Sequence, residues 1–216
     1  MMTQTPNVDA SLTTVAKDLI EKEIDSLVAW LPNPAQLSAD EGRGIIARYG
    51  AVLEGNFIYW MSATYLAVHS PAAKALIVDN LLEEVKDNHP GMLRRFLLAA
   101  HAAPTELDRS SVDKDLENVR EFVGELSTLD LLLMMAFFEG FIQRFMAYLG
   151  DLAAKRGSSE MVYTDVHGVC DIAHTQGLFS AFDAELAIAK NTPPVETLFG
   201  GVRLLRTLVE TIIRPE

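Results

Sequence analysis

The sequence has little cysteine and little positive charge, and each shortage excludes a class of protein. A single cysteine, Cys170, among 216 residues excludes an internal disulfide framework and favours a reducing compartment, so we expect a cytoplasmic protein. Only 18 Lys and Arg stand against 30 Asp and Glu, and the formal net charge of −12 argues against binding to the phosphate backbone of nucleic acids. The polar start, from Met1 to Ser11, lacks the cationic and apolar segments of a signal peptide.

The sequence also lacks a long apolar run that is free of polar side chains. The most apolar stretch, Leu131 to Leu149, is about long enough to cross a bilayer. Its middle carries Glu139, Gln143 and Arg144, and such side chains are costly in hydrocarbon. We therefore expect no membrane contact, and we predict that this stretch is the central helix of a bundle.

No strand-like alternation of useful length occurs, and no repeat with a period of 20 to 50 residues is present. Apolar residues recur instead at helical spacing, interrupted by proline and glycine. The pattern predicts an all-α protein in which residues 11–216 form one bundle of seven or eight helices, after a frayed tail at residues 1–10. The expected helices cover residues 12–31, 45–68, 72–85, 90–100, 112–126, 129–154, 160–189 and 195–213.

The strongest chemical signal is a set of three side chains in the seventh expected helix, namely His167, Asp171 and His174. At roughly 100° per residue they fall within an arc of about 60°, so they point the same way over two turns. The residues between them are small or apolar, which favours a buried face. Buried imidazoles and a buried carboxylate need partners, and a metal ion is a strong one. The alternative is a polar helix stripe with hydrogen-bonded core histidines.

Two further groups could complete a metal site. Glu139 is the only ionisable residue from 131 to 142, and a carboxylate in such surroundings either becomes neutral or finds a cation. Glu83 and Glu84 end one expected helix, and His89 precedes the next; the alternative here is a solvated acidic helix end. A set of carboxylates and histidines suits iron or manganese better than structural zinc, and helix bundles use such sets to hold a pair of metals.

These residues resemble the haem-oxygenase-like diiron oxidases and oxygenases, a family related in fold to the TenA and PqqC proteins. Residues 80–90 resemble the family's Asn-Leu-x-x-Glu … His-Pro block, although the turn before the histidine is shorter here. Glu139 matches the family's central glutamate. The late block is similar in both spacing and residue type: Tyr163-x3-His167-x3-Asp171-x2-His174.

The resemblance implies a seven-helix haem-oxygenase-like fold that binds two irons in place of haem. It implies that one iron is held by Glu84, His89 and late-block residues, and the other by Glu139 and late-block residues. Asp171 or a glutamate would bridge the irons or lie near their shared position. The register counted from Asn80 selects Glu84, and Glu83 is the alternative. The full set of expected ligands is Glu84, His89, Glu139, His167, Asp171 and His174.

The resemblance further implies an O2-dependent oxidation of a small amino acid or carboxylic acid by N-oxygenation, desaturation or C–C cleavage. Expected partners are this substrate, an external electron donor and a second copy of the chain in a homodimer. Arg144 is a candidate for meeting a substrate carboxylate, and the alternative for it is a surface or structural ion pair. Phe138 and Tyr59 are candidates for further substrate contacts. The expected wall of the pocket consists of Phe57, Tyr59, Trp60, Met134, Phe138 and Phe141.

The sequence is also compatible with two functions other than that of a diiron enzyme. A metal-free TenA-like thiamin hydrolase would have the same fold, but its cysteine nucleophile would have to be Cys170, which lies within the ligand helix. A non-catalytic binding bundle would be indifferent to chelators.

Overall fold

The computed structural model describes residues 11–214, and the predicted tail at residues 1–10 lies outside this range. The prediction of an all-α bundle is confirmed for the described part of the chain, which contains helices and no strands. Its elements in chain order are α1 (Leu12–Trp30), η1 (Pro34–Gln36), α2 (Ala39–Leu53), α3 (Asn56–Ala67), α4 (Pro71–Lys86), α5 (His89–Ala99), α6 (Glu106–Gly124), α7 (Thr128–Lys155), α8 (Val162–Leu186), η2 (Val195–Leu198) and α9 (Gly200–Ile213).

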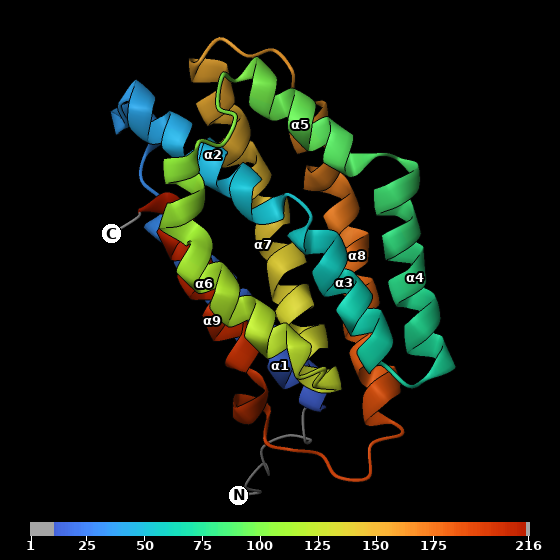
Figure 1. The fold of residues 1–216 in the computed structure, drawn as a ribbon. Helices are drawn as coiled ribbons and strands as arrows, with labels where there is room; N and C mark the ends of the chain where they lie inside the picture. Colours follow the sequence, from blue (N-terminus) through green and yellow to red (C-terminus); the bar gives the residue numbers. More distant parts are fainter. Residues whose placement is uncertain (1–10, 215–216) are drawn as a thin grey trace, which may run out of the picture.

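The longest helix, α7, runs through the middle of the bundle, with α8 packed along it and α4 packed against α8 (Figure 1). Within residues 11–214, α7 is the one helix long and apolar enough to cross a membrane, yet 72% of its most apolar window is buried inside the protein. It therefore occupies the central position that the sequence predicts. The helices α1, α2, α3 and α9 pack around it.

The expected helix 45–68 is divided into α2 and α3, which brings the number of α-helices in the described residues to nine. The break falls at Gly55, whose φ of 82° lies in the left-handed region that glycine adopts without strain. Sequence periodicity missed this break because an isolated glycine is tolerated inside a helix. The break matters for the site, because Leu53 and Phe57 on either side of it line the main cavity.

The turn between α4 and α5 brings the end of one helix next to the start of the other. Asn88 has a φ of 56° and its side chain accepts a hydrogen bond from the backbone N–H of Gly91 at 3.2 Å. Asparagine tolerates the left-handed conformation, and a side chain at Gly91 would overlap this cap. Pro90 lies in the first turn of α5, where its missing N–H is not needed. The turn thereby directs Glu84 and His89 toward each other.

Three expected helix starts are also shifted. The helix expected from residue 45 begins at Ala39. The helix α6 begins at Glu106, six residues before the expected start, because Thr105 and Asp108 form a capping box around its first turn. The expected helix 195–213 instead begins as the short helix η2, and α9 starts only at Gly200.

Candidate metal centre

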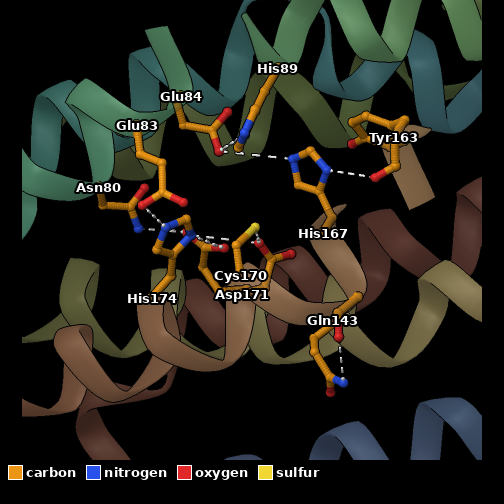
Figure 2. Close-up of polar contacts among 12 residues, drawn as sticks. Asn80, Glu83, Glu84, His89, Gln143, Tyr163, His167, Cys170, Asp171 and His174 are labelled. Atoms are coloured by element: carbon orange, nitrogen blue, oxygen red, sulfur yellow. Dashed lines mark hydrogen bonds and ion pairs between the residues drawn. The ribbon is translucent and has the colours of Figure 1, made fainter. Parts of the chain in front are cut away.

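The six expected ligands come together in one buried cluster formed by α4, α5, α7 and α8 (Figure 2). Each of the six side chains belongs to a residue that is at most 8% exposed. They divide into two triads, and in each triad the candidate ligand atoms lie within 4.8 Å of one another. We call them triad 1, formed by Glu84, His89 and His167, and triad 2, formed by Glu139, Asp171 and His174.

Triad 1 joins the end of α4 and the start of α5 to α8. Glu84 Oε1 lies 2.7 Å from Nδ1 of His89 and 3.9 Å from Nε2 of His167. The Nδ1–H of His167 donates to the backbone carbonyl of Tyr163 at 2.8 Å, so its Nε2 carries the lone pair that faces Glu84. Ligating histidines commonly donate their second N–H to a carbonyl in this way. Burial lowers the pKa of His167, which favours the neutral imidazole that a metal requires.

Triad 2 joins α7 to α8. Nδ1 of His174 lies 3.6 Å from Glu139 Oε2 and 3.6 Å from Asp171 Oδ1. Two neighbours hold the carboxylates in place: the Asn80 amide donates to Glu139 Oε1 at 2.9 Å, and the Cys170 thiol donates to Asp171 Oδ1 at 3.2 Å. Asn80 therefore orients a ligand of triad 2 from α4.

Glu83 and Glu84, the two alternatives for the ligand on α4, take different positions. The Glu84 side chain is 6% exposed and belongs to triad 1, whereas that of Glu83 is 43% exposed. Glu83 Oε2 lies 3.3 Å from Nε2 of His174, on the side of this imidazole away from triad 2 (Figure 2). The geometry thus favours Glu84 as a ligand of triad 1.

The cluster contains buried polar atoms that have no hydrogen-bond partner within residues 11–214. These atoms are Nε2 of His89, Oδ2 of Asp171 and both ring nitrogens of His174. The nitrogens of His174 have only ion-pair contacts, Nε2 with Glu83 and Nδ1 with Glu139 and Asp171. Leaving such an atom without a partner costs about 1–3 kcal/mol. Metal ions would coordinate these atoms and would also balance three carboxylates that lie close together. The donor set therefore fits a pair of divalent cations.

The charges within triad 2 shift the pKa values of its members in the metal-free protein. Burial raises the pKa of Asp171, and the neighbouring Glu139 carboxylate raises it further. Burial alone would lower the pKa of His174, but the carboxylates of Asp171, Glu139 and Glu83 outweigh it and raise the value to about 11. At neutral pH the metal-free triad therefore holds protons that a metal ion has to displace.

This protonation predicts that metal binding releases protons. Titration of metal-free protein with Zn²⁺ at pH 7 should release at least one proton per chain, because His174 is charged below its raised pKa and coordinates only when neutral. Affinity should increase as the pH rises from 6 to 8. Isothermal titration calorimetry in buffers of different ionisation enthalpy measures both quantities. His174→Gln should release fewer protons, and an affinity that falls with rising pH would contradict the prediction.

A cavity of about 600 Å³ leads from the surface to the cluster. Ligands from both triads line it, namely Glu84, His89, Glu139, His167 and Asp171. The remaining wall is largely apolar and includes Leu53, Phe57, Leu93, Leu97 and Ile142. The size is within the range of small-molecule sites, so a substrate can reach the cluster through this opening.

None of the three candidate substrate contacts lines the cavity. Arg144 pairs with Glu21 and Asp25 of α1 and does not line the cavity. Five residues separate it from Glu139, and about 100° per residue turns it roughly 140° away on α7. Tyr59 is 44% exposed, and Phe138 packs against Trp60 with the ring centroids 5.3 Å apart, so neither lines the cavity.

Of the other expected wall residues, Phe57 lines the cavity, whereas Trp60, Met134 and Phe141 do not. Sequence reasoning missed Ile142, although its position three residues after Glu139 indicates the same helix face. It also missed Arg94 of α5, for which the sequence offers no comparable signal.

Comparison with known proteins assigns no family to this arrangement. No protein-family model matches the sequence, and the search of curated proteins found no match either. The function therefore has to be inferred from the chemistry of the cluster and its cavity.

Proposed function

We propose that the chain is a non-haem diiron oxidase or oxygenase with a haem-oxygenase-like fold, acting with O2 on a small amino acid or another carboxylic acid. The observation that supports it is the presence of two buried ligand triads side by side at the end of one cavity. Three carboxylates and three imidazoles, without a thiolate in either triad, suit iron better than structural zinc.

In this proposal triad 1 holds one iron and triad 2 the other. The bound irons would supply the electrons that reduce O2. The chain keeps the ligands in position: Asn80 orients Glu139, and the carbonyl of Tyr163 orients His167. The apolar walls formed by Leu93 and Ile142 limit the access of water and guide a substrate to the cluster.

The state of Cys170 argues against the metal-free hydrolase. Burial raises the pKa of its thiol, and the adjacent Asp171 carboxylate raises it further, so the thiol stays protonated at neutral pH. It donates its hydrogen bond to Asp171, which makes it a poor nucleophile. Its location supports a role in orienting a metal ligand. A cytoplasmic homodimer and an external electron donor belong to the same proposal.

The proposal is tested by anaerobic titration of metal-free protein with Fe²⁺, followed by exposure to O2. Wild-type protein should bind about two Fe²⁺ per chain, consume O2 and give a transient optical band. The variant His167→Ala/His174→Ala should lose iron binding and O2 consumption, because it removes one imidazole from each triad.

The chain offers a matched control in its two exposed histidines outside the cluster, His69 and His101. The variant His69→Gln/His101→Asn should retain both iron equivalents; asparagine suits position 101, where φ is 49°. Circular dichroism checks that both variants are folded. Full iron binding and O2 consumption by His167→Ala/His174→Ala would refute the proposal.

A further inference from the structure

A third group of possible metal ligands shares His174 with triad 2. It consists of Glu83, Cys170 and His174, and candidate ligand atoms of these three residues lie within 4.8 Å of one another. Figure 2 shows Glu83 of α4 directed toward the imidazole of His174 on α8. We call this group the outer site.

His174 is the buried member of the outer site. Its side chain is 6% exposed, and neither ring nitrogen has a hydrogen-bond partner within residues 11–214. Nδ1 lies 3.6 Å from carboxylate oxygens of Glu139 and Asp171, whereas Nε2 lies 3.3 Å from Oε2 of Glu83. The imidazole therefore faces triad 2 with one nitrogen and the outer site with the other.

The thiol of Cys170 distinguishes the outer site from a simple pair of Glu83 and His174. A carboxylate alone would orient the imidazole, as commonly occurs next to ligating histidines. Cys170 adds a third donor: it precedes His174 by four residues, so one turn of α8 places both on the same face. A thiolate, an imidazole and a carboxylate are the ligand types that zinc takes in proteins, and three of them leave one position of its tetrahedron to water.

The outer site is open to solvent at a different place from the cavity. The side chain of Glu83 is 43% exposed and Cys170 is partly exposed, whereas no member of the outer site lines the cavity. A cation from solution can therefore reach the thiol without passing the ligands of triad 1. Neither triad contains a thiol, so the outer site is the group that favours a thiophilic cation.

We propose that Glu83, Cys170 and His174 form a third metal site, which binds a zinc-like divalent cation between α4 and α8. On binding, the thiol loses its proton to solvent, because a coordinating thiol is deprotonated. A neutral imidazole has one lone pair, so a cation on Nε2 of His174 leaves the proton on Nδ1, where it faces triad 2. A cation in the outer site thus withdraws His174 from triad 2. The consequence for iron rests on the proposed function, whereas the outer site itself does not.

The test uses Co²⁺ as a visible substitute for Zn²⁺. Because Cys170 is the one cysteine of the chain, a cobalt–thiolate charge-transfer band can come from no other residue. Titration of reduced, metal-free protein with Co²⁺ should produce this band in the near ultraviolet. Zn²⁺ should then abolish it by displacing Co²⁺, because a tetrahedral site with a thiolate suits zinc. Cys170→Ser should give no band.

Three further variants locate the cation. Glu83→Gln should raise the Kd of Co²⁺ about tenfold or more, since even residues that only support a metal ligand contribute this much. Asp79→Asn removes an exposed carboxylate of α4 that lies outside the outer site, and it should leave the Kd within about twofold of wild type. Glu139→Gln removes a ligand of triad 2 and should keep the band. Circular dichroism checks that each variant is folded.

The proposal is overturned if wild-type protein gives no band, which would leave Glu83 only the role of orienting His174. It is also overturned if Zn²⁺ fails to displace Co²⁺, or if Glu83→Gln binds Co²⁺ as tightly as Asp79→Asn does. Loss of the band in Glu139→Gln but not in Glu83→Gln would mean that Cys170 binds the cation of triad 2, and would overturn it as well. Because no iron is present, the outcome is independent of the proposed iron chemistry.

Discussion

Replacing His89 with alanine is expected to lower the iron stoichiometry from two ions per chain to one and to reduce O2 uptake by about a hundredfold or more. His89 belongs to triad 1 alone, and it contributes a buried Nε2 that has no other partner within the described residues. Triad 2 keeps all three of its ligands in this variant. A single remaining iron cannot provide the paired site on which the proposed O2 chemistry depends.

Metal analysis after anaerobic dialysis gives the stoichiometry, and an oxygen electrode gives the rate. Glu139→Gln is the counterpart in triad 2 and should also leave one iron, whereas His101→Asn should leave two. If His89→Ala retained two irons, His89 would not be a ligand. If His89→Ala and Glu139→Gln each lost both irons, the two triads would not be separable sites.

Replacing Trp60 with alanine should lower the free energy of unfolding by about 3–5 kcal/mol. Trp60 is fully buried, and its ring packs edge-on against Phe138 with the centroids 5.3 Å apart. The substitution leaves a cavity beside α7 that the rigid helices cannot fill. Chemical denaturation measures the loss, and the melting temperature should fall by about 10 °C.

The adjacent Tyr59 supplies a control for Trp60. Because Tyr59 is 44% exposed, Tyr59→Ala should change the free energy of unfolding by only about 0.5 kcal/mol. Trp60→Phe retains a ring and removes an indole N–H that has no partner in residues 11–214, so it should be milder than alanine. A loss below 1 kcal/mol for Trp60→Ala, or an equal loss for Tyr59→Ala, would contradict this account of the core.

The buried face of α8 could be predicted from the sequence because every regular α-helix turns by about 100° per residue. This rotation places three residues on one face of any regular helix, namely His167, Asp171 and His174. In the structure all three are buried. Glu139 was identifiable because it is an isolated charge in an apolar helix. Neither argument depends on how the helices are arranged relative to one another.

The cavity could not be predicted in the same way, because part of its wall comes from helix ends and breaks. The interruption at Gly55 and the turn at Asn88 depend on single residues with left-handed backbone, which periodicity does not detect. The expectation for Arg144 used its closeness to Glu139 in the sequence, but on a helix closeness in sequence does not imply a shared face. Arg94 could be found only after α5 had been placed beside the opening.

The unpartnered polar atoms of the two triads also bear on how long the protein persists in a cell. Without metal, the chain carries buried nitrogen and oxygen atoms that would be better solvated in the unfolded state. Ligands that bind only the folded state shift the folding equilibrium in its favour, so the proposed binding of iron would oppose unfolding. When iron is scarce, more chains would unfold and be degraded by proteases. The abundance of this protein would then follow the iron supply even at a constant rate of synthesis.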